Sequence, residues 1–273
     1  MKVYVSADLE GIWGVVSRKQ LGGENPDYSR ARRLMTEEVN LVCRELFKNG
    51  ATEVLVNDAH GPMDNLMIEE LHPDANLISG YPKDLSMMEG VADGVDCAML
   101  IGYHPKVGTT KGLFEHTYAS NVVSQLTING EILGETGLNA LVAGHYNIPV
   151  VLVAGDWQVT QDAKIEIGNI ETVGVKKAVS RYCARHISQN QLQEAYAVAI
   201  TKALKNIKQA PVKKPALPIT LNIKLAQVIM AEQAAVFPGA KLLDEFTIEY
   251  EARDVVEMYK AFRAIVTLAA KEL

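Results

Sequence analysis

Short apolar runs alternate with longer stretches of helical periodicity along most of the chain. Four of the runs predict strands, at residues 3–5, 53–56, 96–101 and 149–154. The last two are apolar almost throughout, which is typical of strands covered on both faces. From residue 28 to residue 49, apolar side chains recur at steps of three and four, so this stretch predicts an amphipathic helix.

The remaining pattern predicts shorter elements. We expect a short helix over residues 66–71 and a hairpin over residues 122–133 around Asn129-Gly130. Helices are expected over residues 134–146, from the end of the strand at Asp156 to about residue 167, and over residues 189–208, with a strand segment near residues 173–175. After residue 218 we expect a strand at residues 219–225, a short helix at residues 226–237, two strands within residues 242–252, and a terminal helix from Asp254.

This order of elements predicts an α/β fold with a mostly parallel central sheet flanked by helices. The composition changes only around Pro211, Pro215 and Pro218, which marks the best candidate for a boundary. We therefore expect a metal-binding catalytic α/β domain over residues 1–210 and a smaller C-terminal α+β domain over residues 211–273.

Composition narrows the classes of protein to consider. Apolar residues make up 48% of the chain and charged residues 22%, as in an ordinary globular protein, and the net charge of -6 argues against a nucleic-acid partner. The widely spaced Cys43, Cys97 and Cys183 fit neither a disulfide framework nor a thiolate zinc site, and are expected to be buried thiols in a reducing compartment. We find no secretion signal and no apolar run near the ~18 residues of a membrane span, so we expect a cytoplasmic protein without a membrane partner.

Metal-ligand side chains follow four of the predicted strands. They are Asp8 and Glu10, Asp58 and His60, His104, and Asp156. Residues two apart on an extended chain share a face, and the carboxyl ends of parallel strands meet at one edge of the sheet. Asp8 as a loop cap beside a solvated Glu10 is the simpler interpretation of that pair alone, but four strand ends of this kind favour a shared site.

Carboxylates and imidazoles without thiolates suit zinc, manganese or cobalt. Two or three acidic groups and two histidines suffice for a pair of ions about 3.5–4 Å apart that share a bridging carboxylate. The sequence therefore predicts a metal site, with one ion or two, at this edge of the sheet.

The other candidate side chains have competing explanations. His72 precedes a proline in a predicted turn and is expected at the surface, while His145 and His186 are expected to be packed or exposed residues without a role. Glu135 lies in the first turn of a predicted helix, where the helix dipole alone favours a carboxylate. His116 lies on a loop without apolar periodicity, and a structural and a functional role are equally compatible with that position.

Several separate motifs, taken together, resemble the D-aminopeptidases of the dipeptide-transport operon type, peptidase family M55. The motifs are Ser-Ala-Asp-Leu-Glu-Gly at residues 6–11, Asn-Asp-Ala-His-Gly at residues 57–61, Gly-Tyr-His at residues 102–104, His116, Gly-Glu-Thr-Gly-Leu-Asn-Ala at residues 134–140, and Ala-Gly-Asp at residues 154–156. The resemblance also takes in residues 35–38, 175–176 and 180–181, and it runs from residue 1 to the C-terminal helix.

The resemblance implies a dinuclear zinc hydrolase that removes a D-amino acid, typically D-Ala, from the N-terminus of short peptides. It also implies a large homo-oligomer of stacked rings, such as a decamer. Carried over by position, the ligands of two Zn²⁺ ions per chain are Asp8, Glu10, His60, His104 and Glu135, and the catalytic histidine is His116. Asp156 matches a family position to which we assign no role.

We therefore expect a zinc-dependent aminopeptidase acting on short peptides. The alternatives are a metallo-amidase for another small substrate and, in a different class, a ring-forming binding protein with a vestigial site, which is disfavoured because no ligand position has been lost. His116 is expected to be a proton shuttle or a nucleophile, and Glu115 to orient its ring or raise its pKa. The loop sequence before His116, together with Trp13 and Trp157 near the expected mouth of the site, bears on substrate preference.

Overall fold

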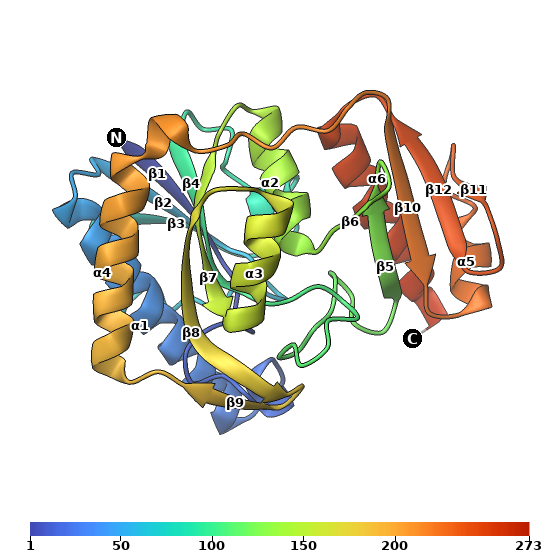
Figure 1. Ribbon diagram of the computed structural model, residues 1–273. Coiled ribbons are helices and arrows are strands. Elements are labelled where there is room, and N and C mark those ends of the chain that lie inside the picture. Colours follow the sequence, from blue (N-terminus) through green and yellow to red (C-terminus); the bar gives the residue numbers. More distant parts are fainter. Residues whose placement is uncertain (273) are drawn as a thin grey trace.

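In the computed structural model, which describes residues 1–272, a seven-stranded sheet A forms the centre of the molecule (Figure 1). Its strand order is β3-β2-β1-β4-β7-β8-β9, and all neighbours are parallel except β9, which runs antiparallel to β8. The strands are β1 (Lys2–Ala7), β2 (Glu53–Asp58), β3 (Ala75–Ile78), β4 (Cys97–Tyr103), β7 (Val150–Asp156), β8 (Glu171–Ser180) and β9 (Cys183–His186).

Helices cover both faces of sheet A. On one face lie α1 (Pro26–Lys48) and α4 (Gln189–Lys205), and on the other lie α2 (Glu135–His145) and α3 (Trp157–Glu166) (Figure 1). Every residue of β4 and β7 is buried, as their apolar sequences predict. The helix ends are encoded locally: Asn25 caps α1 ahead of Pro26, and Ser188 and Gln191 form a capping box at the start of α4.

A second, antiparallel sheet lies beyond α2 and has five strands within the same described residues. Sheet B has the order β11-β12-β10-β5-β6, with α6 (Val255–Ala269) packed between this sheet and α2, and α5 (Val228–Ala234) packed on α6. Its strands are β5 (Val123–Ile128), β6 (Glu131–Ile132), β10 (Ile219–Leu225), β11 (Lys241–Leu242) and β12 (Thr247–Ala252). Short 3-10 helices complete the chain at η1 (Arg18–Gln20), η2 (Ser86–Met88), η3 (Ile207–Gln209) and η4 (Ala270–Glu272).

The structure confirms the predicted fold class and most elements, including the Asn129-Gly130 hairpin and the terminal helix that Asp254 caps. The helix predicted at residues 66–71 is wrong, because this stretch forms turns in which the backbone N–H of Leu66 donates to the Asp58 carboxylate. The short edge strands β3 and β9 were not predicted. Cys43 and Cys97 are buried as expected, but Cys183 is exposed because it lies on the edge strand β9.

Sheet B draws strands from both sides of the expected boundary at residue 210. The hairpin β5-β6 precedes that boundary, yet β5 pairs with β10 over residues 221–225. A division of the chain at residue 210 therefore stays a prediction, and the second sheet is not formed by residues 211–273 alone.

The strand order of sheet A places a topological switch point between β1 and β4. From β1 the chain moves outward to β2 and β3, whereas from β4 it moves outward in the opposite direction to β7 and β8. Ligands of open α/β sheets bind in the crevice beyond the carboxyl ends of the strands at such a point.

Two glycines let the segments after β1 and β4 approach closely at this switch point. A Cβ atom on Gly11 would lie 2.0 Å from the Tyr103 carbonyl oxygen, and one on Gly102 would lie 2.1 Å from the Asp8 carbonyl oxygen. Two backbone hydrogen bonds hold these segments together, from Asp8 N to the Ile101 carbonyl (2.8 Å) and from Gly11 N to the Gly102 carbonyl (2.7 Å). Both glycines are therefore required for the chain to bring these two strand ends together.

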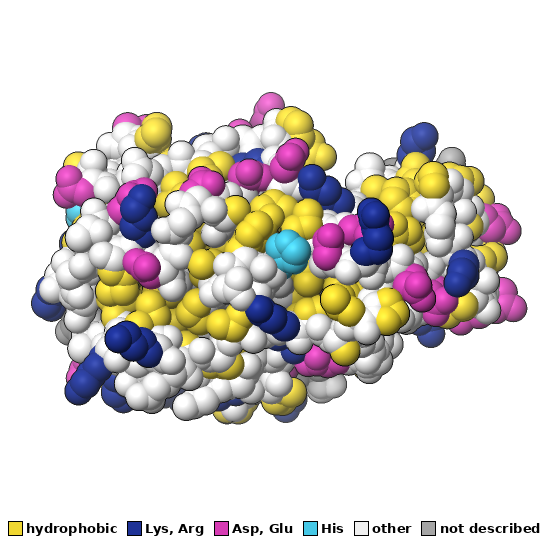
Figure 2. All heavy atoms as spheres, turned by 90° about the horizontal axis from the view of Figure 1, so that it is seen from above, with side chains coloured by type: hydrophobic (Ala, Val, Ile, Leu, Met, Phe, Trp, Pro, Cys, Tyr) yellow, Lys and Arg dark blue, Asp and Glu magenta, His cyan; other side chains and the backbone are white. Residues whose placement is uncertain are grey.

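The surface carries no block of positive charge on the face at the amino ends of the parallel strands. Figure 2 shows this face, on which Lys and Arg side chains are scattered among acidic ones and apolar side chains gather toward the middle. This distribution agrees with the net charge of -6. Within residues 1–272, none of the helices combines the length and the apolar character that crossing a membrane requires.

Candidate metal centre

Five side chains from four separate segments converge beyond the carboxyl edge of sheet A. Asp8 and Glu10 follow β1, His60 follows β2, His104 follows β4, and Glu135 is the first residue of α2. All five are buried, with between 2% and 8% of their surface exposed. The structure thus brings together the residues that the family resemblance selected from the sequence.

These side chains form two groups that share Asp8. The groups are Asp8, Glu10 and His60, and Asp8, His104 and Glu135, and the potential ligand atoms of each group lie within 4.8 Å of one another. Asp8 Oδ1 lies 3.2 Å from His60 Nδ1, whereas Asp8 Oδ2 lies 3.6 Å from His104 Nε2. The two oxygens of Asp8 therefore face different histidines, one in each group.

Each histidine at the site has one ring nitrogen tied to a backbone carbonyl. The pairs are His60 Nε2 with Leu21 O (2.8 Å), His104 Nδ1 with Pro105 O (3.0 Å) and His116 Nδ1 with Phe114 O (2.9 Å). A carbonyl only accepts, so the tied nitrogen carries the hydrogen, and this assigns the other nitrogen as the one that faces the carboxylates. Histidines that bind metals are usually held in this way, with the second N–H donated to a carbonyl or carboxylate.

The cluster is electrostatically incomplete without a cation. Burial, together with the neighbouring Glu10, raises the pKa of Asp8 to about 7. Burial opposes protonation of His104, but Glu135 and the other carboxylates raise its pKa to about 10. Burial also opposes protonation of His60, but Glu10 and Asp8 raise its pKa well above the usual value. His104 Nε2 is buried without a hydrogen-bond partner among the described residues, and it points at Asp8 and Glu135. Protons must therefore balance these carboxylates unless a metal ion replaces them.

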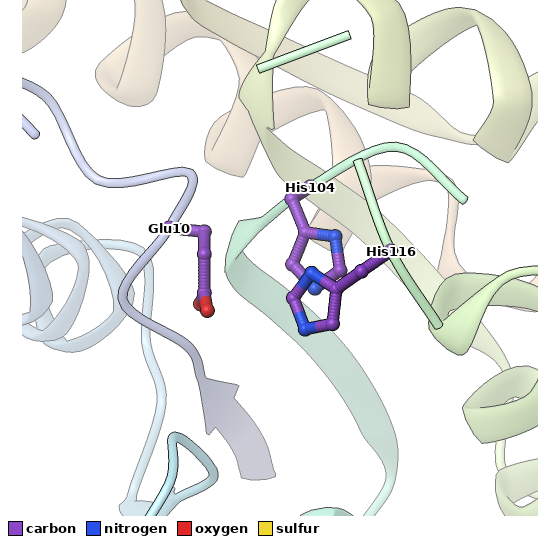
Figure 3. A group of neighbouring side chains, drawn as sticks. All are labelled: Glu10, His104 and His116. Carbon is purple, nitrogen blue, oxygen red and sulfur yellow. The ribbon is translucent and has the colours of Figure 1, made fainter. Parts of the chain in front are cut away.

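His116 lies beside the cluster but differs from the other two histidines. Its ring stacks on the His104 ring at a centroid distance of 4.0 Å and an angle of 7°, and Glu10 faces the pair (Figure 3). His116 Nε2 is 3.7 Å from Glu135 Oε1, and His116 also forms a potential ligand group with Glu10 and His104. Burial and the adjacent His104 lower the pKa of His116, so its free nitrogen is a proton acceptor near neutral pH.

The expected role of Glu115 is wrong. Its carboxylate pairs with Arg181 (Nε to Oε2, 2.9 Å) and does not contact the His116 ring, whose pKa is lowered and not raised. Arg181 Nη2 also donates to the Glu115 carbonyl (3.1 Å), and the Phe114 N–H donates to the Arg181 carbonyl (3.1 Å). The turn between β8 and β9 therefore holds the loop that carries His116.

Two other strand-end candidates have structural roles. Asp58 accepts hydrogen bonds from the Asn65 side chain (2.8 Å) and from the Leu66 N–H (2.7 Å). Asp156 caps α3 by accepting from the Val159 N–H (2.9 Å) and also accepts from the Leu113 N–H (3.1 Å). Neither carboxylate belongs to the ligand groups found in the described residues.

The remaining histidines lie away from the cluster, as predicted. His72 stacks on Phe47, His145 is exposed at the end of α2, and His186 accepts a hydrogen bond from the Gly14 N–H. The two tryptophans expected at the mouth do not line the cavity at the cluster within the described part of the chain. Trp13 donates to the Ile187 carbonyl, and Trp157 starts α3.

Comparisons with known proteins agree over nearly the whole chain. Residues 1–264 match the peptidase M55 family, described as D-aminopeptidase. A D-aminopeptidase of Bacillus subtilis (strain 168) is 38% identical over 273 residues, which cover 99% of this chain and 98% of that protein. The solved structure of the Zn-dependent D-aminopeptidase DppA from Bacillus subtilis, described as a self-compartmentalizing protease, matches with a TM-score of 0.96 at 38% identity, covering 99% of this chain and 98% of that one.

Lys176 on β8 supports the cluster in a way that the sequence did not reveal. It is 1% exposed, and its Nζ donates to the carbonyls of Glu10 (2.7 Å), Ile12 (2.6 Å) and Val15 (2.6 Å). Burial lowers the pKa of Lys176 to about 7, but three carbonyl acceptors favour the ammonium form, because a neutral amine has only two hydrogens. One side chain thus holds three carbonyls of the loop that begins at Glu10.

We predict that Lys176→Met lowers the free energy of unfolding by at least about 3 kcal/mol, because three buried carbonyls lose their donor at a cost of about 1–3 kcal/mol each. Urea denaturation of the metal-free protein measures this. The matched control is Lys177→Met, at the exposed neighbouring position, where only a contact with the Trp157 ring is lost and the change stays within about 1 kcal/mol. Equal effects of the two substitutions would show that the buried contacts do not hold the loop.

Proposed function

The chain belongs to the peptidase M55 family of D-aminopeptidases, and on that premise we propose that this metallo-aminopeptidase uses zinc to remove an N-terminal D-amino acid, such as D-alanine, from short peptides. The observation that carries the proposal is the pair of carboxylate–histidine groups that share Asp8. Such a pair is the ligand arrangement of a two-metal hydrolase.

The donor set fits zinc. Carboxylates and neutral imidazoles are zinc ligands, and the buried, unpartnered His104 Nε2 faces two carboxylates at the position where a cation would be bound. We assign one ion to Asp8, Glu10 and His60, and a second to Asp8, His104 and Glu135. Two ions per chain with Asp8 between them is therefore the proposed composition.

His116 is the proposed catalytic residue. Zinc, when bound, supplies the Lewis acidity that polarises a scissile carbonyl and makes water acidic near neutral pH. His116 Nε2 faces Glu135 while its Nδ1–H is held by the Phe114 carbonyl, so the ring is oriented to accept a proton and to pass it to the leaving amine. The alternative role, attack by His116 on the carbonyl, uses the same nitrogen.

Two alternatives share some of these features. A metallo-amidase for another small substrate would use the same ligands, and the assay below separates it from a peptidase. A ring-forming binding protein with a vestigial site is disfavoured, because all five ligand positions are present and converge.

We also propose that the chain assembles into a closed homo-oligomer of stacked rings, such as a decamer, in the cytoplasm. The solved relative is described as self-compartmentalizing. In this chain several large apolar side chains are strongly exposed, including Ile165 (78%), Val236 (71%) and Leu217 (69%). Burial of such side chains between subunits would enclose the active sites and restrict access to short peptides.

We predict hydrolysis of dipeptides that begin with D-alanine, loss of that activity after chelation, and its recovery with added zinc. The assay compares D- and L-alanine at the N-terminus of otherwise identical dipeptides, with simple amides of other small acids as controls. Turnover that survives complete metal removal would contradict a metal-dependent reaction. Cleavage of the simple amides with no cleavage of any dipeptide would favour the metallo-amidase.

We predict that His116→Ala lowers kcat by about 10²–10⁴-fold with no loss of bound zinc, as expected for removal of a general acid or base. The pKa of His116 is lowered below its usual value of 6.5, so with zinc kept saturating, the wild-type kcat falls only below that pH, and the variant lacks this fall. His145→Ala, at an exposed position away from the cluster, is the control and leaves kcat unchanged. If His116→Ala loses one equivalent of metal, His116 is a ligand and the proposed role is incorrect.

We predict a mass of several chains of 29.9 kDa in size-exclusion chromatography with light scattering at micromolar concentration. A decamer is the expected particle. A monomer under these conditions would overturn the proposed assembly, without bearing on the metal site.

A further inference from the structure

A cavity of about 240 Å³ joins the metal-ligand cluster to the C-terminal helix. Asp8, Glu10 and Glu135 line one part of it, and the side chains of Arg263 and Thr267, on α6, line another. Its volume is below the range of about 300–1,000 Å³ that is typical of small-molecule sites, so it suits a substrate of very few residues. The metal-site mechanism gives the α6 side of this cavity no role.

Arg263 has no carboxylate partner among the side chains of the described residues. Its Nη1 donates to the carbonyls of Lys83 (2.9 Å) and Asp84 (2.7 Å), which uses both hydrogens of that nitrogen. Among the side chains that the structure describes, no carboxylate lies within ion-pair distance of Arg263, and Nε and Nη2 make no hydrogen bond to them. A guanidinium held in this way keeps three free N–H donors, including the planar edge that binds a carboxylate through two parallel hydrogen bonds.

The position of this guanidinium is fixed relative to the metal cluster. Lys83 is buried, and its Nζ donates to the Asn57 side chain (2.8 Å) and to the Asp58 carbonyl (2.7 Å), at the end of the strand that leads to His60. Arg263 therefore rests on the backbone of a residue that is itself bonded to the β2 strand end. The cation and the cluster are thus two fixed points in one cavity.

We propose that Arg263 binds the terminal α-carboxylate of the substrate, so that the enzyme selects very short peptides that end in a free carboxylate. The inference rests on the proposed aminopeptidase function, which places the N-terminal amine and the scissile bond at the metal cluster. The candidate metal cluster at one part of the cavity and the guanidinium at another can receive the two ends of the same short peptide, the N-terminal end at the cluster and the terminal carboxylate at Arg263. Arg263 is a specificity-determining residue in this account, and a peptide amide of the same size lacks its ligand.

A purely structural role is the competing explanation, because Arg263 also ties α6 to residues 83–84. Arg263→Gln removes the charge and the pair of parallel donors. Because the shorter glutamine side chain also weakens the contact with residues 83–84, the comparison of two ligands below separates the two roles. Lys260→Gln is the matched control. Lys260 lies on the same helix and pairs with the exposed Asp84 (3.8 Å), but it does not line the cavity at the cluster.

The test is calorimetric binding of a non-hydrolysable reduced-amide analogue of alanyl-alanine, as the free acid and as the carboxamide, to the zinc-loaded protein. We expect the wild type and Lys260→Gln to bind the acid about ten- to a hundredfold more tightly than the carboxamide, and Arg263→Gln to bind the two equally. Equal binding by the wild type overturns the proposal. So does a preference that survives in Arg263→Gln, or a loss of affinity for both ligands by the same factor, which is the signature of a structural role.

Hydrolysis of D-alanyl-D-alanine and of its C-terminal amide separates failure of this inference from failure of the proposed function. If the wild type cleaves both with equal kcat/KM, the role of Arg263 is wrong while the aminopeptidase function stands. If it cleaves neither but the binding preference and its loss in Arg263→Gln are observed, the proposed reaction is wrong while Arg263 is supported as the carboxylate site.

Discussion

Three carboxylates buried side by side are the constraint on which the rest of the site depends. Asp8, Glu10 and Glu135 are each almost inaccessible to solvent, and their mutual repulsion has to be offset. His60 and His104 offset it in the metal-free chain only as imidazolium ions, which is why their pKa values are raised. Divalent cations do so without protons, and the histidine rings are already held by carbonyls in the orientation that metal ligation needs.

The fold supplies this cluster from distant parts of the chain. The switch point between β1 and β4 brings two strand ends together, and Gly11 and Gly102 allow the backbones after them to touch. Lys176 then fixes the loop after Glu10 through three carbonyls. The antiparallel sheet B positions α6, so that Arg263 lines the same cavity as the candidate metal ligands.

Local patterns in the sequence were sufficient to predict that several candidate ligands lie at one edge of the sheet. The spacing of Asp8 and Glu10, and the apolar runs ahead of His60 and His104, predicted a shared edge, since parallel strands align their ends. The same argument failed for Asp58, whose carboxylate accepts hydrogen bonds from the Asn65 side chain and from the Leu66 N–H, and Leu66 lies in a turn that was expected to be a helix.

Other features depend on contacts between distant residues, and periodicity does not encode them. Glu135 could be selected only by family resemblance, because a carboxylate in a first helical turn already has an explanation in the helix dipole. The carbonyl partners of Lys176 lie more than 160 residues away along the chain, and β5 pairs with a strand from the other side of the expected boundary. Neither the hydrogen bonds of Lys176 nor the pairing of β5 with β10 can be predicted from the local sequence.

Calorimetric titration of the metal-free protein with zinc measures how many ions the cluster of carboxylates and histidines binds. We expect saturation at two ions per chain, together with release of protons near neutral pH, because the neighbouring carboxylates raise the pKa values of His60 and His104 and a bound metal ion displaces the protons. Zinc binding weakens accordingly as the pH falls. Saturation at one ion per chain would contradict a two-metal site that shares Asp8.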